Sequence, residues 1–366
     1  MTVNISKPAV NVREKLAELD KPTGIAGEAM LRAETPQEQF NLIGAGRRNI
    51  IINGDMRIAQ RGTSVTGIGN NAGNPFTCDR FQHAQGSGGG SGVMTMEQST
   101  DGPDGFSNSL KLTVTTADTL SGGENVGIRH RIEGQNVQHL KFGSSSAESI
   151  TISFWVKASL TGTYGLELFS AGGSRDSLKA YTVSVANTWE YKTLTFVGDT
   201  GAAIANDVNR GLELFFSLDA GPNDIVDPYT WPGNAALRAP TGQVNFMATS
   251  GATWQITGVQ LEVGKVATPF EHRSYGEELA LCQRYYWRPP SGTQFFAFQY
   301  QPGYRMSQVR MPVEMRTTPT VQYNTSGGSG WSSHNHNNTH IGYYAAAANT
   351  LASNVYIHDL KCDAEL

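Results

Sequence analysis

The spacing of apolar residues changes near residue 49 of the chain. Before this point apolar side chains recur with the period of a helix, as Val12, Leu16 and Leu19 do. From there to about residue 273, apolar and polar residues alternate along short segments, which is the two-residue period of a β-strand. The pattern therefore predicts a helical N-terminal segment followed by a long β-rich region.

The N-terminal segment, residues 1–46, contains clear start signals for short helices. Thr35 is a good N-cap residue, Pro36 occupies the first helical position, and Glu38 completes a capping box. Helices this short, with narrow apolar faces, are marginal in water on their own. We expect this segment to bury its apolar stripes against a partner or against other copies of the chain.

The alternating region contains nine predicted strands, separated by turns rich in Gly, Asn, Asp and Ser. They are Asn49–Asn53, Ser109–Thr115, Gly127–Ile132, Ile150–Lys157, Gly165–Ser170, Tyr181–Val185, Glu190–Val197, Gly211–Leu218 and Trp254–Leu261. In the segment ISFWVK, Trp155 and Lys157 point to the face opposite Phe154. Many short strands at this spacing predict an antiparallel β-sandwich or barrel.

One clear helix is predicted after these strands. Ser274 is its N-cap, Glu277 completes a capping box, and Pro289 and Pro290 end it. Its apolar face is predicted to contain Tyr275, Leu279, Cys282 and Tyr286. We expect this face to be buried around the symmetry axis of an oligomer. Residues 291–366 return to aromatic alternation, which predicts a small terminal β-domain.

Composition supports a turn-rich β-protein and narrows the choice of partners. Charged residues make up 16% of the chain and 41 of 366 residues are Gly, which suits short strands joined by many turns. The net charge of −4 argues against nucleic acid or an anionic membrane as a partner. No apolar run approaches the roughly 20 residues of a membrane span. The opening MTVNISKPAV also lacks the apolar core of a signal peptide.

Three cysteines, Cys78, Cys282 and Cys362, lie far apart in the sequence. An odd number at such spacing argues against a disulfide framework. We expect three free thiols, partly buried, in a protein that is made in a reducing cytoplasm.

Motifs of common enzyme classes are absent from the sequence. It contains no H-E-x-x-H, G-x-S-x-G, C-x-x-C or Walker motif. We therefore expect a protein that is not an enzyme. A glycosidase needs only two carboxylates roughly 5–10 Å apart, which a sequence does not reveal, so an enzyme that cuts polysaccharide stays open as an alternative.

A series of phrases along the chain resembles a known class of proteins. The phrases are NIIINGDMRIAQRGTS, CDRF, HRIEGQNVQHLKFG, ITISFWVKASLTGTYGLEL, NTWEYKTLTF, WQITGVQLEVGKVATPFEHRSYGEELALCQRYY and RMPVEMRTTPTV. The series resembles bacteriophage virion proteins, chiefly tail fibres and receptor-binding proteins, that carry a jelly-roll domain similar to carbohydrate-binding modules. The N-terminal GEAMLRAETPQEQFNLIGAGRRN is similar to the virion-attachment arm of such proteins.

The resemblance implies a mainly β protein with an antiparallel jelly-roll β-sandwich and four parts. They are a helical virion-attachment arm (1–46), the jelly roll (47–273), a connecting helix (274–290) and a C-terminal β-tip (291–366). It also implies a homotrimer, made in the host cytoplasm and assembled on the virion, that binds other virion proteins through residues 1–46. The expected function is that of a tail fibre that adsorbs to a host surface glycan. The alternatives are a structural component without a receptor, such as a head decoration or fibre shaft, and a polysaccharide depolymerase.

Sugar binding requires exposed aromatic faces beside polar partners, because a sugar ring has an apolar face and a polar rim. Trp231 and Tyr229 lie in a loop bounded by Pro and Gly, with Asp224 and Asp227 just before them. These four residues are the predicted ligand-binding site. The alternative is that Trp231 packs over its own loop. Three other tryptophans, Trp155, Trp189 and Trp254, lie in strand patterns and are expected to pack in the core.

The sequence contains two candidate metal sites. His334 and His336 would face the same side of a strand, and three chains around a threefold axis would supply six imidazoles to iron or nickel. The alternative is a solvated loop tip rich in His and Asn. Related jelly rolls also carry a structural Ca²⁺, which Asp55 or Glu262 would bind here, although Gly258 stands where such modules often place Asp.

Overall fold

The computed structural model describes most of the chain after residue 47. The described residues are 48–69, 73–86, 90–231, 238–296, 298–301, 304–326, 331–334, 336–346 and 356–366. Asn49–Leu366 form one compact unit. The predicted arm over residues 1–46 lies outside the described residues. Within the described part, no helix has the length and apolar character needed to cross a membrane.

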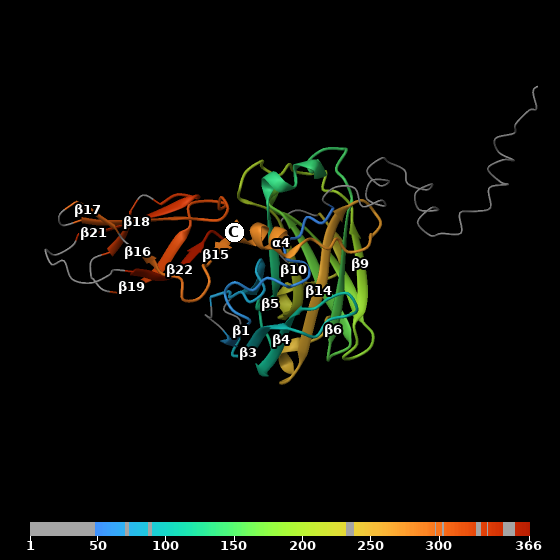
Figure 1. Ribbon diagram of the computed structural model, residues 1–366. Helices are drawn as coiled ribbons and strands as arrows, with labels where there is room; N and C mark the ends of the chain where they lie inside the picture. Colours follow the sequence, from blue (N-terminus) through green and yellow to red (C-terminus); the bar gives the residue numbers. More distant parts are fainter. Residues whose placement is uncertain are drawn as a thin grey trace, which may run out of the picture. The chain divides into compact units, whose positions relative to one another are not determined.

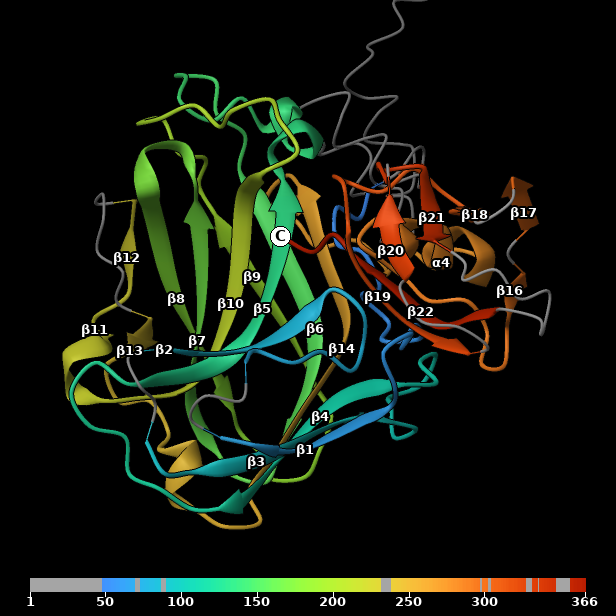
Figure 2. The same cartoon turned by 90° about the vertical axis from the view of Figure 1, so that its left-hand side faces the viewer.

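Two six-stranded antiparallel sheets pack face to face in the larger part of this unit (Figures 1 and 2). Sheet A has the order β1 (Ser64–Ile68), β3 (Val93–Ser99), β4 (Ser109–Thr116), β14 (Thr253–Val263), β6 (Ile150–Ala158), β9 (Glu190–Phe196). Sheet B, which faces the viewer in Figure 2, has the order β12 (Tyr229–Thr230), β8 (Arg175–Val183), β7 (Gly162–Ser170), β10 (Arg210–Ala220), β5 (Asn125–Glu133), β2 (Phe81–Gly86). The protein is thus mainly β, with a jelly-roll β-sandwich, as the sequence predicts.

Strand alternation places one apolar row of each sheet in the space between them. Phe154 of β6 contacts Phe216 of β10 edge-on, with ring centroids 5.2 Å apart. The Trp254 ring of β14 lies 6.0 Å from that of Phe216. All three side chains are fully buried. The prediction that Trp254 packs in the core is therefore confirmed.

Several short elements complete the sandwich. β11 (Ile225–Val226) pairs in parallel with β13 (Ala239–Pro240). The 3₁₀ helices are η1 (Gly134–Asn136), η2 (Gln138–Leu140), η3 (Gly172–Ser174), η4 (Pro222–Asp224) and η5 (Phe246–Ala248).

One predicted strand, Asn49–Asn53, is wrong. The Asn49 side chain accepts hydrogen bonds from the backbone N–H groups of Ile51 and Leu261. These bonds to a side chain replace backbone bonds that a strand would make with its neighbour. Asn53 has a positive φ of 61°, which ends the extended conformation there. β1, β2 and β3 were not predicted, because they are short and carry few apolar residues, as in the β2 segment FQHAQG.

The helix α4 (Tyr275–Gln283) begins as predicted. The Ser274 side chain accepts a hydrogen bond from the backbone N–H of Glu277 at 3.3 Å. The predicted apolar face is wrong, because Tyr275 is 57% exposed and Tyr286 lies in the strand β15. The helix instead buries Cys282 together with the Glu278 carboxylate.

Two four-stranded antiparallel sheets form the C-terminal part. One contains β15 (Tyr286–Trp287), β16 (Phe295–Phe296), β19 (Thr320–Ser326) and β22 (Tyr356–Asp363). The other contains β17 (Phe298–Gln301), β18 (Tyr304–Arg310), β20 (Trp331–His334) and β21 (His340–Ala346). A separate apolar cluster that includes Met315, Ile341 and Leu360 fills this part. The domain boundaries of the sequence analysis stay predictions.

The three cysteines are free and buried, as expected. Burial raises the pKa of the Cys362 thiol to about 12, so it is protonated at neutral pH. The thiols therefore pack as small apolar groups.

Candidate functional site

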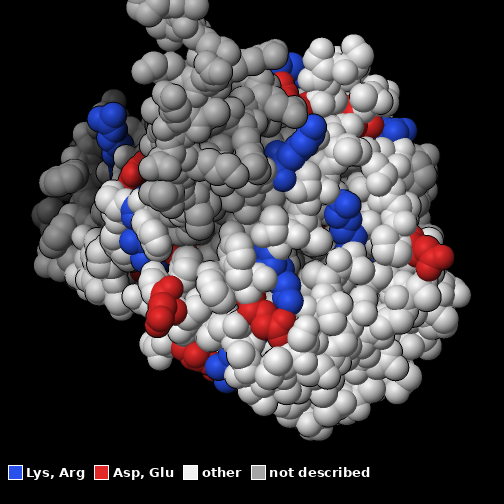
Figure 3. Space-filling view, turned by 90° about the vertical axis from the view of Figure 1, so that its right-hand side faces the viewer, with Lys and Arg blue, Asp and Glu red and all other residues white. Residues whose placement is uncertain are grey.

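The outer face of sheet A carries partly exposed aromatic side chains. Trp155 on β6 points away from the core, as its position next to Phe154 requires. Tyr191 stands directly opposite it on the edge strand β9, and the two ring centroids are 5.3 Å apart. Tyr191 is 45% exposed. We call the set Trp155, Trp189 and Tyr191 the aromatic face. Figure 3 views the molecule from this side and shows scattered charges on a mostly uncharged described surface.

An ionised carboxylate stands at the rim of the aromatic face. Asp101 accepts hydrogen bonds from the Lys157 ammonium and, at 3.3 Å, from the Trp189 indole N–H. The Lys157 nitrogen also lies 5.7 Å from the centre of the Trp189 ring. The hydrogen bond from Lys157 holds the pKa of Asp101 below its usual range. The rim therefore offers a fixed acceptor and a cation beside the aromatic rings.

A glycine in a β-bulge makes room for this arrangement. The register between β14 and β6 shifts between Thr257 and Gln260, and Gly258 in the bulge has a φ of 62°. A Cβ atom at Gly258 would lie 2.8 Å from the Phe106 ring and 3.1 Å from the Trp155 ring. Only glycine fits both the backbone conformation and the space under these rings.

Replacing Gly258 with alanine is expected to destabilise the protein and displace Trp155. The left-handed backbone costs about 1–2 kcal/mol for a residue with a Cβ, and the contact with the two rings adds about 1–3 kcal/mol. Urea unfolding followed by tryptophan fluorescence measures both effects. The matched control is Gly251→Ala, because Gly251 has a φ of 82° but no atom within 4 Å of a new Cβ. Equal losses for the two variants would contradict the predicted contact.

Trp231 does not have the exposed ring that is predicted from the sequence. Trp231 is only 7% exposed, and its ring contacts Phe142 edge-on at 5.6 Å. Its indole N–H donates to the Val197 carbonyl at 2.7 Å. The expectation of an exposed stacking face at Trp231 is therefore wrong, and the packing alternative describes this residue.

Two other residues of the predicted ligand site, Tyr229 and Asp224, are held by different strands. The Tyr229 hydroxyl donates to the Asp176 carboxylate of β8 at 2.8 Å. Asp224 accepts from the Asn125 amide of β5 at 2.6 Å, and burial raises its pKa. Asp227 is exposed. With Trp231 buried, Tyr229 is the partly exposed aromatic residue of the predicted site, and its role in binding stays a prediction.

The aromatic face corrects the expectation that Trp155 and Trp189 pack in the core. Both side chains are partly exposed on the outside of sheet A. A signal for Trp155 was present in the sequence, because the alternation in ISFWVK places it opposite Phe154. No comparable signal existed for Trp189 or for the rim residue Asp101, which is brought there from a distant loop.

The residues proposed to bind metals have other surroundings. His334 is the last residue of β20, whereas His336 follows residue 335, which lies outside the described part. The Glu262 carboxylate accepts hydrogen bonds from Thr268 and Gln260, and Asp55 pairs with Arg57 at 2.5 Å. Among the described residues there is no group of three or more His, Cys, Asp or Glu side chains arranged to hold a metal ion.

The outer face of sheet B buries its charges instead of displaying them. Glu167 and Glu213 are 1% and 2% exposed, and one Arg238 nitrogen lies 3.1 Å and 3.7 Å from their oxygens. Burial raises the pKa of Glu167 to about 7, against the opposing effect of Arg238. Burial acts on Glu213 in the same direction, but Arg131 and Arg210 hold its pKa below the usual range. Both carboxylates are buried in contact with arginine side chains, so we assign this cluster a structural role.

Glu167 is expected to make stability fall as the pH rises. Its pKa is about 7 in the folded protein against 4.5 in the unfolded chain, so folding favours the protonated form. The stabilisation is complete below pH 4.5 and is lost as the pH passes through about 7. Between pH 5 and pH 8 the loss is about 2–3 kcal/mol, at roughly 1.4 kcal/mol for each pKa unit.

Urea unfolding of wild type and Glu167→Gln over this pH range measures that loss. The variant should lack it, because glutamine does not titrate. Glu148→Gln, at a position where the side chain is 40% exposed, is the control and should follow wild type. Parallel stability curves for wild type and Glu167→Gln would contradict the assignment.

Among the known proteins compared with this chain, only solved structures are similar to it. No protein-family model matches the chain, and no curated protein sequence matches it. The enzymatically active domain of tailspike protein 4 from bacteriophage CBA120 is similar at 16% identity and a TM-score of 0.33 over 59% of this chain and 21% of that one. This chain thus spans about a fifth of that domain's length.

Carbohydrate-binding modules are similar over comparable lengths. A family 4 module is 15% identical with a TM-score of 0.30, over 58% of this chain and 98% of the module. The family 11 module of Clostridium thermocellum, in complex with a mixed-linked tetrasaccharide, is 10% identical with a TM-score of 0.28, over 58% and 99% of the two chains. Likenesses this distant leave the function of this protein to be argued from its own residues.

Proposed function

We propose that this protein binds carbohydrate through the aromatic face of sheet A. The observation that carries the proposal is the pair Trp155 and Tyr191, whose partly exposed rings stand side by side on adjacent strands. A sugar ring presents an apolar face that stacks on such rings and a rim of hydroxyl groups that needs polar partners. Asp101 and Lys157 supply an acceptor and a donor at the edge of the same surface.

The binding we propose is shallow and gains strength from multiple copies. The rings lie on the outside of a sheet, so each site covers little of a sugar chain and binds it weakly. Several linked copies raise the overall affinity by orders of magnitude without any new contact. A homotrimer would supply such copies, and we include this assembly in the proposal.

The setting we propose is a bacteriophage virion. Support comes from the sequence phrases that resemble virion proteins, including the attachment-arm phrase within residues 1–46. In this proposal the arm holds the protein to other virion components, and the sandwich adsorbs to a host surface glycan as part of a tail fibre. We propose binding without catalysis, because the sequence lacks the motifs of common enzyme classes.

A glycan array that contains bacterial surface polysaccharides tests this function. The full-length protein should bind a subset of the array, and a Trp155→Ala, Tyr191→Ala double variant should lose that binding. Incubation of bound polysaccharides with the protein should release no reducing ends. Unchanged binding by the double variant would refute the aromatic face as the site, and release of reducing ends would identify a depolymerase instead.

A further inference from the structure

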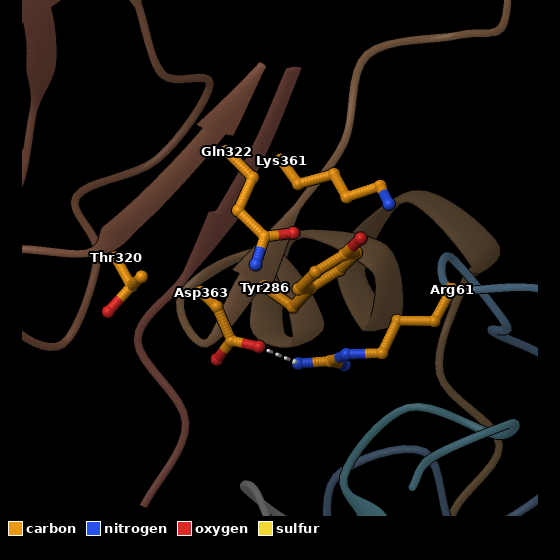
Figure 4. A pocket seen from close by; sticks show the side chains of 6 residues that line it. All are labelled: Arg61, Tyr286, Thr320, Gln322, Lys361 and Asp363. Carbon is orange, nitrogen blue, oxygen red and sulfur yellow. Dashed lines mark hydrogen bonds and ion pairs between the residues drawn. The ribbon is translucent and has the colours of Figure 1, made fainter. Parts of the chain in front are cut away.

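A pocket of about 240 Å³ lies where a loop of the sandwich meets the C-terminal strands (Figure 4). Its lining combines charged, hydroxyl and amide groups with one aromatic ring. The lining residues are Arg61, Tyr286 of β15, Thr320 and Gln322 of β19, and Lys361 and Asp363 of β22. None of them belongs to the aromatic face of sheet A.

One wall of the pocket is held in place by internal contacts. The Arg61 guanidinium lies 3.7 Å from the centre of the Tyr286 ring. It also pairs with Asp363 at 3.2 Å and with Glu365 at 3.4 Å. Figure 4 shows the Arg61 side chain reaching Asp363 across this wall. Because Arg61 is only 13% exposed and has these partners, its charge is already compensated.

The opposite side of the pocket carries polar groups whose hydrogen-bonding capacity is unused. In the described part of the chain, the Lys361 ammonium, the Gln322 amide and the Tyr286 hydroxyl have no ion-pair or hydrogen-bond partner. Figure 4 shows the Lys361 and Gln322 side chains converging on the Tyr286 ring. Burial raises the pKa of Tyr286, so its hydroxyl stays protonated and can donate. The pocket therefore presents several donors and one uncompensated positive charge.

We propose that this pocket binds a single sugar ring that carries a carboxylate, as a uronic acid does. The Lys361 ammonium would pair with the carboxylate, and Gln322 and Tyr286 would donate hydrogen bonds to its oxygens or to ring substituents. Asp363, whose side chain is 45% exposed, would accept a hydrogen bond from a sugar hydroxyl. The volume is below the 300–1,000 Å³ or so of pockets for drug-sized ligands, which suits one ring. The choice of a sugar rests on the proposed function, but the site is separate from the aromatic face.

Binding of D-galacturonate, D-galactose and acetate to the full-length protein tests the proposal. Titration calorimetry and saturation-transfer NMR should show binding of galacturonate, with galactose and acetate each at least about tenfold weaker. A Lys361→Met variant should bind galacturonate about tenfold more weakly, because the charge-assisted hydrogen bond is lost. Lys265→Met, at an exposed lysine outside the pocket, is the matched control and should bind as wild type does.

Three results would overturn the proposal. The first is an unchanged affinity for galacturonate in Lys361→Met. The second is galactose that binds as tightly as galacturonate. The third is acetate that binds as tightly as galacturonate, which would show a simple anion site. A Trp155→Ala variant separates this test from that of the proposed function. It should keep galacturonate binding in the pocket even if the glycan array shows no role for the aromatic face.

Discussion

Replacing Trp155 with alanine is expected to remove most of the proposed glycan binding and to leave the fold intact. An aromatic anchor at the centre of a binding surface contributes about 2 kcal/mol or more, which is roughly a thirtyfold loss in affinity for each site. In the proposed homotrimer, linked copies would multiply that loss, so the proposed adsorption to host cells should fall further than the affinity of a single site. Surface plasmon resonance on an array-selected glycan measures the loss for a single site.

Stability measurements separate this effect from unfolding. Trp155 is partly exposed, so its truncation should cost clearly less than that of the fully buried Trp254, for which about 3–5 kcal/mol is expected. Tyr275→Ala is the matched control, because Tyr275 is an exposed aromatic residue outside the aromatic face. Trp155→Ala with normal glycan binding, or with a loss of stability equal to that of Trp254→Ala, would contradict our assignment.

Replacing Arg284 with alanine is expected to destabilise the protein by about 3 kcal/mol, because it leaves a buried carboxylate without its cation. Glu133 at the end of β5 is fully buried, and each of its oxygens lies 2.7 Å from an Arg284 nitrogen. The Tyr285 hydroxyl donates to the same carboxylate at 2.6 Å. Burial acts to raise the pKa of Glu133, and the contacts with Arg284 and Tyr285 outweigh it and hold that pKa below the usual range.

An exposed ion pair provides the comparison for Arg284→Ala. Lys141 and Glu148 lie 2.6 Å apart, but their side chains are 55% and 40% exposed. Lys141→Ala should therefore cost less than about 1 kcal/mol. Urea unfolding at pH 7 measures both variants. Equal, small losses would show that Glu133 finds a replacement donor or becomes protonated at little cost.

The strands with strong apolar alternation could be predicted from the sequence. Ser109–Thr115 and Ile150–Lys157 were placed within one residue of the observed β4 and β6. Each of these strands carries a row of apolar side chains long enough to require burial. Because side chains alternate between the two faces of a strand, this row determines which face turns toward the core. β2 was missed because its segment FQHAQG lacks such a row, and it is held instead by pairing with β5.

The start of α4 could also be predicted, because its signal lies in neighbouring residues of the sequence. The N-cap hydrogen bond joins Ser274 to Glu277, three positions along the chain, so a short stretch of sequence is enough to predict it. The buried face of α4 could not be predicted in this way, because Glu278 is buried by contacts with Asn53 and Arg273. A carboxylate with such partners loses the usual preference of charged residues for the surface.

For the candidate sites too, some features could be predicted from neighbouring residues and others depend on the tertiary structure. By itself the sequence determined that the chain is mainly β and that Trp155 points away from Phe154, because both follow from the spacing of neighbouring residues. Only the tertiary structure decided that Trp231 is buried and that Asp101 stands beside Trp189, 88 positions away. Exposure and proximity depend on which strands pair and which loops cover them, and those pairings join residues that no local pattern relates.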